Sequence, residues 1–182
     1  MDRLPERFYE RSNSMQGEFV RAVFIVVLIA VSSLFVFGQA KATTSVAVDV
    51  EGGKAVTLAA ADLAKLPRVE IKAKDHDGVE HTFGGIELRA ILAPQGAKFG
   101  ADLRGKAVAQ YLIVEAADDY HAVYSLTELD PDFTDKTVIL ADKIDGKLLD
   151  PKDGPWQVVA TNEKKHARWV RQVTALKVRL AK

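Results

Sequence analysis

Apolar and polar side chains alternate with a period of two along several short stretches of the chain, and this pattern is typical of half-buried strands. Turn-forming pairs such as Gly52-Gly53 and Asp145-Gly146 separate these stretches. The segment 107–117 is apolar on both faces near its middle, which predicts a central strand. The strands that we expect are 46–50, 69–74, 79–83, 107–117, 120–126, 138–141, 156–160 and 175–180.

Stretches with the periodicity of a helix are fewer than the strand-like stretches, and they are short. Thr57 is a suitable cap for a short helix that stops before Pro67. The pattern contains no long strand–helix–strand units, so it predicts an α+β, mainly β domain rather than a doubly wound parallel sheet. Besides this helix, which begins after Thr57 and runs through 60–63, the helices that we expect are 86–92, 126–129 and 163–170.

An uncharged apolar run precedes the first strand, from Ala22 to Gly38. Arg21 comes before the run, and Ala40-Lys41-Ala42 follows it with small side chains at the two positions that signal peptidase reads. We therefore expect residues 1–42 to be a signal peptide that is cleaved after Ala42. The alternative is an uncleaved anchor, since the run is near the lower limit of length for a spanning helix.

The leader has two candidate start positions, because the polar and charged stretch before Met15 makes a leader that begins at Met1 unusually long. With either start position, we expect residues 43–182 to form one exported domain, which is periplasmic or secreted. Cleavage leaves this domain without a stable membrane anchor.

The composition of the chain argues against some partners and excludes cysteine-based bonds. The chain has 25 Lys and Arg residues against 25 Asp and Glu residues, and this balance argues against nucleic acid or an anionic membrane surface as a partner. The chain contains no cysteine, so it can form neither a disulfide nor a thiolate–metal bond. An exported domain of this kind depends on its hydrophobic core for stability.

Short motifs along the chain occur in the order found in the sulfite-oxidase-type molybdopterin-binding domain. The stretch FGGIELRAIL at 83–92 resembles that family's G-x-x-L-x-x-L-L helix, and Asp119-Tyr120 resembles its D-G-Y step. The segments 138–149, 154–159 and 168–173 resemble later motifs of the family. This resemblance implies layered mixed β-sheets with a few short helices, a molybdopterin cofactor and oxidoreductase activity.

The chain departs from that family where the metal would be held. The family's cysteine ligand lies on a loop after the strand that matches 69–74, whereas here this strand runs directly into the tight turn Asp75–Gly78. Gln157 stands where the family usually has arginine. Because a metal–sulfur bond needs a thiolate, we assign no catalytic residue, and molybdopterin is implied by the resemblance alone.

Basic residues gather where the family binds the pterin phosphate. Lys165, His166 and Arg168, with Asp119 and Tyr120 from an earlier turn, form our candidate anion-binding or pterin-like cleft. The simpler alternatives are a solvated helix face and a polar turn. These alternatives also apply to the neighbouring residues Lys164, Arg171, Asp118, His121 and Tyr124, and we expect Trp169 to pack in the core.

The predicted hairpin also carries two histidines, His76 and His81, beside Asp75 and Asp77. This spacing matches no zinc motif, and an exposed polar hairpin explains it more simply, so we predict no metal site. The sequence also contains no nucleophile elbow, phosphate-binding loop or paired-carboxylate pattern.

Three functions are compatible with these observations. The first is an exported relative of the molybdopterin oxidoreductases that lacks thiolate-ligated molybdenum catalysis and binds a small anionic ligand or a protein partner. The second is a genuine periplasmic molybdopterin-dependent oxidoreductase with a metal ligand other than cysteine. The third is a structural domain whose edge strands bind another envelope protein.

Overall fold

The computed structural model describes residues 44–53 and 55–182. The predicted signal peptide and its cleavage site lie outside the described residues. Among the residues that are described, no helix has both the length and the hydropathy needed to cross a bilayer.

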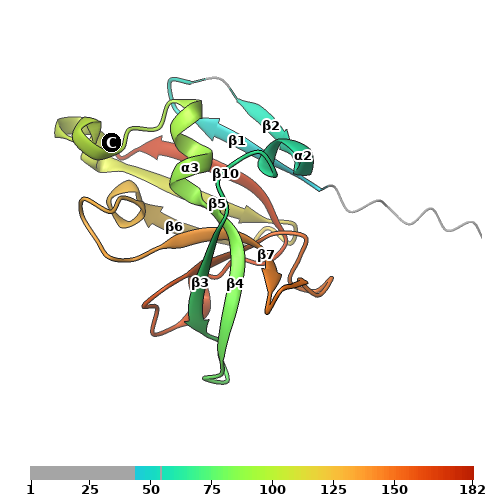
Figure 1. The fold of residues 1–182 in the computed structure, drawn as a ribbon. Coiled ribbons are helices and arrows are strands. Elements are labelled where there is room, and N and C mark those ends of the chain that lie inside the picture. The colour runs from blue at the N-terminus through green and yellow to red at the C-terminus, as the bar shows by residue number, and fades with distance from the viewer. Residues whose placement is uncertain (1–43, 54) are drawn as a thin grey trace, which may run out of the picture. The chain divides into compact units, whose positions relative to one another are not determined.

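Strands make up most of the described chain, and its helices are short (Figure 1). The strands are β1 Ser45–Val50, β2 Val56–Ala59, β3 Val69–Lys74, β4 Glu80–Glu87, β5 Gln110–Ala116, β6 His121–Ser125, β7 Val138–Ile144, β8 Lys147–Leu148, β9 Gln157–Ala160 and β10 Val173–Leu180. The α-helices are α2 Ala60–Leu63 and α3 Leu88–Leu92, and the 3₁₀ turns are η2 Ala93–Gln95, η3 Gly100–Asp102, η4 Gly105–Ala109, η5 Leu126–Leu129 and η6 His166–Arg168.

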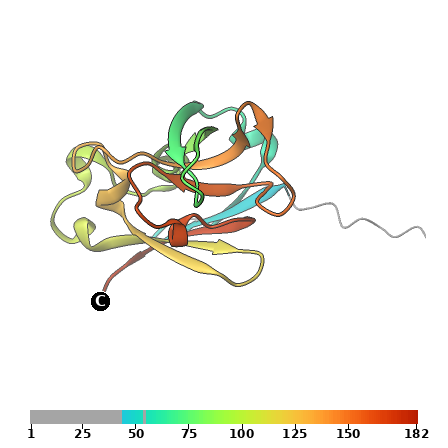
Figure 2. The same ribbon diagram turned by 90° about the horizontal axis from the view of Figure 1, so that it is seen from below.

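The strands form two sheets. Sheet A has the order β2-β1-β10-β5-β6, with β1 parallel to β10 and the other pairs antiparallel. Sheet B is antiparallel, with the order β3-β4-β7-β8 and β9 paired to β7. Figure 2 shows the green and orange strands of sheet B on one side of the yellow, red and cyan strands of sheet A. The predicted α+β, mainly β fold is confirmed.

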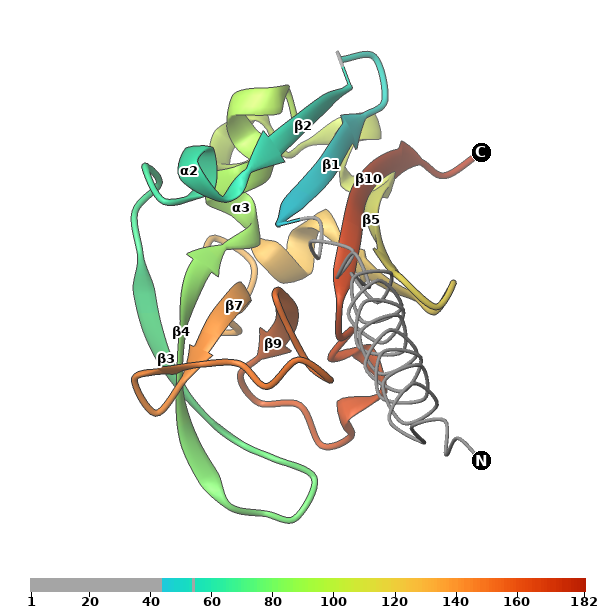
Figure 3. The same ribbon diagram turned by 90° about the vertical axis from the view of Figure 1, so that its right-hand side faces the viewer.

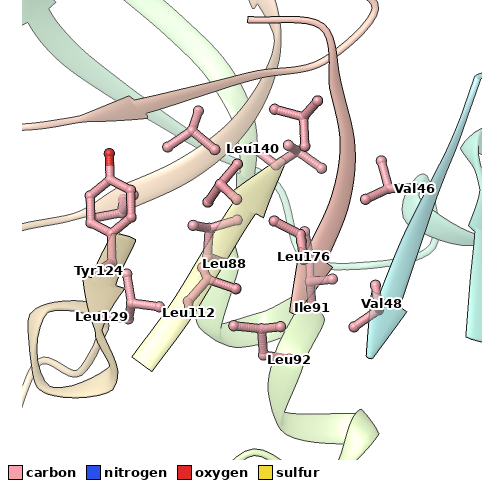
Figure 4. Close-up of a cluster of buried hydrophobic side chains, with 14 of the residues drawn as sticks. Val46, Val48, Leu88, Ile91, Leu92, Leu112, Tyr124, Leu129, Leu140 and Leu176 are labelled. Carbon is pink, nitrogen blue, oxygen red and sulfur yellow. The ribbon is translucent and has the colours of Figure 1, made fainter. Parts of the chain in front are cut away.

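The main core lies between sheet A, helix α3 and the inner part of sheet B (Figure 4). Strands β1, β5 and β10 place Val48, Leu112 and Leu176 in it, and α3 adds Ile91. Because α3 follows directly from β4, its apolar face packs in this core without a long connection. A second, smaller cluster lies in sheet B around Phe83 and Trp169.

Two of the expected elements differ in the structure. Thr57 does not cap a helix, because 56–59 pairs with β1 as an edge strand and α2 begins only at Ala60. Ile86 belongs to β4, so α3 is shorter than predicted and begins at Leu88. The predicted central strand β5 does have a partner on each side, β10 and β6, although β10 and not β5 is the middle strand of sheet A.

The predicted helix 163–170 is reduced to one 3₁₀ turn, η6. Its backbone groups have partners elsewhere: the Tyr120 and Tyr124 hydroxyls donate to the carbonyls of Ala167 and Arg168, and Val158 N–H donates to the carbonyl of Val170. In a helix over 163–170 these carbonyls would lie in the last turn and have no donor within the helix, so the contacts do not replace helical bonds but anchor the segment to β6 and β9.

The β3–β4 hairpin extends from sheet B, and its turn lies at the opposite end of the domain from β1 and β2 (Figure 3). This hairpin carries the two histidines and two aspartates for which the sequence predicts no metal site. It therefore places them beside the β7–β8 turn and far from the strands that begin the domain.

Candidate ligand-binding cleft

A cleft of about 750 Å³ lies where the β3–β4 hairpin, the β5–β6 turn and the segment 144–171 meet. Its volume is in the range of pockets that hold a small organic molecule. Because residues of both sheets contribute, the cleft forms only when the two sheets are assembled. The residues that line it include Asp75, Asp77, His81, Asp118, Tyr120, Asp145, Leu148, Asp150, Asp153, Gln157, His166, Trp169 and Arg171.

The hairpin turn is built by its first residue. Asp75 Oδ1 accepts hydrogen bonds from the backbone N–H groups of Asp77, at 3.0 Å, and Val79, at 2.9 Å. Gly78 has a φ of +81°, which a glycine adopts without a steric penalty. The turn chemistry therefore holds the Asp75 carboxylate at the edge of the cleft.

His81 joins the hairpin to the β7–β8 turn. Its Nδ1 lies 2.6 Å from Asp145 Oδ2, and its Nε2 lies 3.3 Å from Asp75 Oδ2. Asp145 is also held by Thr82, whose backbone N–H donates to Oδ1 at 2.9 Å. An imidazole flanked by two carboxylates can donate to both of them only when it is protonated.

The pKa values of this group of residues follow from these contacts. The hydrogen bond to Asp145 is the main reason why the pKa of His81 lies above its ordinary value. Burial opposes this rise, and the charge of Asp145 and the contact with Asp75 add to it. The pKa of Asp145 is lowered by the Thr82 N–H and then by His81. The bridge across the cleft edge is therefore ionic at acidic to neutral pH.

Aromatic side chains form one wall. Phe83 and Trp169 meet edge to face with ring centroids 5.5 Å apart, and the His166 ring lies 4.3 Å from that of Trp169. Tyr120 is 48% exposed, and its hydroxyl donates to the Ala167 carbonyl at 2.6 Å. The expectation that Trp169 packs in the core is confirmed, since it is buried in the smaller cluster, although it also lines the cleft.

Gln157 lines the cleft from β9, and only 7% of its surface is exposed. Among the described residues, its side-chain amide makes no hydrogen bond. Arg171 lies nearby in the cleft, with its Nε 3.0 Å from Asp153 Oδ1. The cleft thus contains a largely buried glutamine, a buried Trp169 Nε1 without a hydrogen-bond partner among the described residues, and a guanidinium that is already paired with a carboxylate.

The structure separates the five residues predicted to form a site. Tyr120 and His166 line the cleft, whereas Asp119 and Lys165 are exposed and lie outside its lining. Asp119 serves the β5–β6 turn, where it has a φ of +64°. Arg168 also lies outside the lining.

The guanidinium of Arg168 is instead part of an ion-pair network. It pairs with Glu163 and, at 3.1 Å, with Glu128, and Lys136 lies 2.9 Å from Glu163. The Arg168 pKa is raised by these two carboxylates, although partial burial opposes the shift. Such a network holds η6 in place, which in turn positions His166 at the cleft.

Several lining residues were not predicted as members of a site, among them Asp145, Asp150 and Leu148. Asp145 carries a local signal only for a turn, because Asp145-Gly146 is a typical turn pair. Leu148 is 75% exposed, which is unusual for a large apolar side chain and is visible only in the folded structure.

The tip of the hairpin brings Asp75, His76 and Asp77 close together, with one ligand atom of each residue within 4.8 Å of the others. The side chains of His76 and Asp77 are 71% and 70% exposed. Water therefore competes for these groups, and the arrangement resembles an ordinary polar hairpin more than the enclosed sites that hold structural metals.

Comparison with solved structures shows a protein of similar fold. No family model matches the chain, and no curated protein matches it. Among solved structures, the sulfane dehydrogenase SoxCD from Paracoccus pantotrophus is similar, with a TM-score of 0.60 and 17% sequence identity over 77% of this chain. The match covers 39% of the SoxCD chain, so the present chain spans about two-fifths of its neighbour's length. The chain is therefore similar in fold to a component of a sulfur oxidoreductase.

Proposed function

We propose that residues 43–182 form an exported small-ligand-binding domain that uses the cleft beside the β3–β4 hairpin and does not carry out thiolate-ligated molybdenum catalysis. The observation that carries this proposal is the cleft itself, where polar groups from both sheets converge beside the largely buried Gln157 and a buried Trp169 Nε1 that has no hydrogen-bond partner in the described part of the chain. Convergent polar groups in an aromatic-walled cavity are the usual features of a small-molecule site.

The residues of the cleft do not fit a molybdopterin, which the family resemblance implies. The chain offers no thiolate, and a tight hairpin turn occupies the position of the ligand loop. A pterin phosphate is anionic, yet six aspartates line the cleft against three Lys and Arg side chains. Gln157 supplies a neutral amide where an arginine would be expected. We therefore propose no reaction that uses this cofactor.

Analysis of the chain purified from the exported fraction tests this part of the proposal. Molybdenum and pterin should both be far below one equivalent per chain. One molybdenum atom per chain would overturn the proposal in favour of an oxidoreductase with an oxygen or nitrogen metal ligand.

Binding is tested on the same material by recording amide NMR spectra while small charged and neutral compounds are added. Shifts that gather at the hairpin, the β7–β8 turn and η6 are the expected result. A Gln157→Leu variant should lose them, whereas an Asp102→Asn variant, altered at an exposed aspartate outside the cleft, should keep them. If no compound shifts these residues and the domain instead captures a protein through an edge strand, the proposal fails.

The export part of the proposal rests on the apolar run Ala22–Gly38 and on Ala40-Lys41-Ala42. Mass spectrometry of the mature chain should show that it begins at Thr43. A chain that keeps residues 22–38 and sediments with membranes would overturn cleavage without affecting the assignment of the cleft.

A further inference from the structure

Carboxylates outnumber cationic side chains in the cleft. The cationic residues are Lys147, Lys152 and Arg171, and Arg171 already lies 3.0 Å from Asp153. With His81 counted as protonated and the other two lining histidines as neutral, the cleft has a formal charge of −2. Its carboxylates are Asp75, Asp77, Asp118, Asp145, Asp150 and Asp153.

Two of these carboxylates have no ion-pair partner among the described residues. Asp118 accepts a hydrogen bond from the Tyr120 N–H at 3.2 Å, and Asp150 contributes its backbone carbonyl to the N–H groups of Asp153 and Gly154. Their negative charge therefore remains available to a ligand. Asp75 and Asp145, by contrast, are occupied by His81.

Aromatic and apolar surfaces lie next to these charges. Tyr120 and Trp169 offer ring surfaces, and Leu148 projects an exposed apolar side chain. Aromatic faces attract cations, and this attraction grows when the site is partly shielded from water. Gln157, a largely buried residue of the lining, supplies a side-chain carbonyl oxygen that can accept an N–H bond.

We infer that the ligand of this cleft is an organic cation, an ammonium or guanidinium group on an apolar or aromatic body. This inference rests on the proposed function. The carboxylates of Asp118 and Asp150 hold the charge, the Gln157 carbonyl accepts an N–H, and the aromatic wall covers the body of the ligand. The same charge disfavours the anionic ligand that the basic cluster in the sequence suggested.

The test compares compounds that differ chiefly in charge. Tyramine and agmatine are the cationic probes, N-acetyltyramine is the neutral match for tyramine, and inorganic phosphate is the anion. Each is titrated into the full exported chain at millimolar concentration and followed by amide NMR. We expect both cations to shift residues of the cleft, and N-acetyltyramine to bind at least about tenfold more weakly than tyramine.

Substitutions then test which side chains of the cleft bind the cation. Asp118→Asn with Asp150→Asn should weaken binding of tyramine by about tenfold or more, and Gln157→Leu should also weaken it. Asp102→Asn is the matched control and should leave the affinity unchanged. Because Gln157 is buried, thermal melting checks that its variant folds, and the double aspartate variant keeps the test valid if it does not.

The outcomes separate this inference from the proposed function. If phosphate or N-acetyltyramine binds in the cleft as tightly as tyramine, the cation inference fails while ligand binding stands. Binding of Zn²⁺ at 75–77, with no response to either amine, also overturns it. If none of these probes shifts the cleft, the inference fails, and the wider search with neutral compounds decides the proposed function separately.

Discussion

The guanidinium carbon of Arg168 lies 4.4 Å from the centroid of the Tyr124 ring, and the Tyr124 hydroxyl donates a 2.6 Å hydrogen bond to the Arg168 carbonyl. Tyr124 is fully buried in the main core, and burial raises the pKa of its hydroxyl. One residue of β6 therefore holds both the side chain and the backbone of η6, so this contact links the core of sheet A to the segment that positions His166 at the cleft.

Replacing Tyr124 by Phe should lower the free energy of unfolding by about 1–2 kcal/mol, because it leaves the Arg168 carbonyl without its donor. Tyr120→Phe is the matched control. It removes a hydroxyl bond of the same length, to Ala167, from a residue that is 48% exposed, and should cost less than about 0.5 kcal/mol. Urea denaturation measures both variants. Equal losses would show that burial of the hydroxyl does not set its contribution.

Arg168→Met should destabilise the domain by about 2 kcal/mol, because Glu163 is only 10% exposed and loses one of its two cationic partners. A double-mutant cycle with Glu163→Gln should give a coupling energy of about 1 kcal/mol. The control is Arg89→Met, whose pair with Glu87 is exposed and 3.8 Å long, with an expected effect below about 0.5 kcal/mol. A coupling energy near zero would mean that the network adds nothing to the fold.

Most of the strands were predictable from sequence because alternation of apolar residues is a local property. Their partners were not, since β1 pairs in parallel with β10 from the far end of the chain. The edge strand β2 was predicted as part of a capped helix, because Thr57 has local capping chemistry and its pairing with β1 is visible only in the fold. The resemblance to molybdopterin-binding domains supplied the layered arrangement.

The cleft was harder to predict than the fold. Tyr120 and His166 both line the cleft, whereas Arg168 was grouped with them because its partners Glu128 and Glu163 could not be known from sequence. The contact of His81 with Asp145 depends on the register that sets Phe83 opposite Ile144, beyond a register shift at Gly84/Gly85 where β7 has one extra residue. The charged side chains of the cleft come from separate segments, and strand pairing brings them together.

Gly85→Ala should destabilise the domain by about 2 kcal/mol or more, because a Cβ at this position would lie 2.3 Å from the Leu140 oxygen and 2.7 Å from the Ala141 Cα. Both are backbone atoms, so no side-chain rotation relieves the contact. Gly84→Ala is the matched control, since its nearest contact is 3.5 Å, to Lys143 Cβ, and its effect should stay below about 1 kcal/mol. Thermal melting compares the two, and similar melting temperatures would contradict the close approach of β4 to β7.

Stability should depend on pH through His81. Because folding raises the pKa of this histidine above its ordinary value of 6.5, its ion pairs stabilise the fold fully below that value and lose their effect as the pH rises through the folded-state pKa. The lowered pKa of Asp145 acts in the opposite sense, since its contribution is present above the ordinary value of 3.8 and is lost on acidification. The His81–Asp145 contact should therefore stabilise the domain most at about pH 5–6.

His81→Gln isolates this contribution. The difference in melting temperature between the wild-type chain and this variant should be largest at about pH 5–6 and should shrink toward pH 8–9, where the imidazole can no longer donate to both Asp145 and Asp75. His76→Gln on the same hairpin is the control, and its 71% exposed side chain should give a small difference at every pH. A His81→Gln difference that stays constant across this range would mean that the histidine bridges the two turns without carrying a charge.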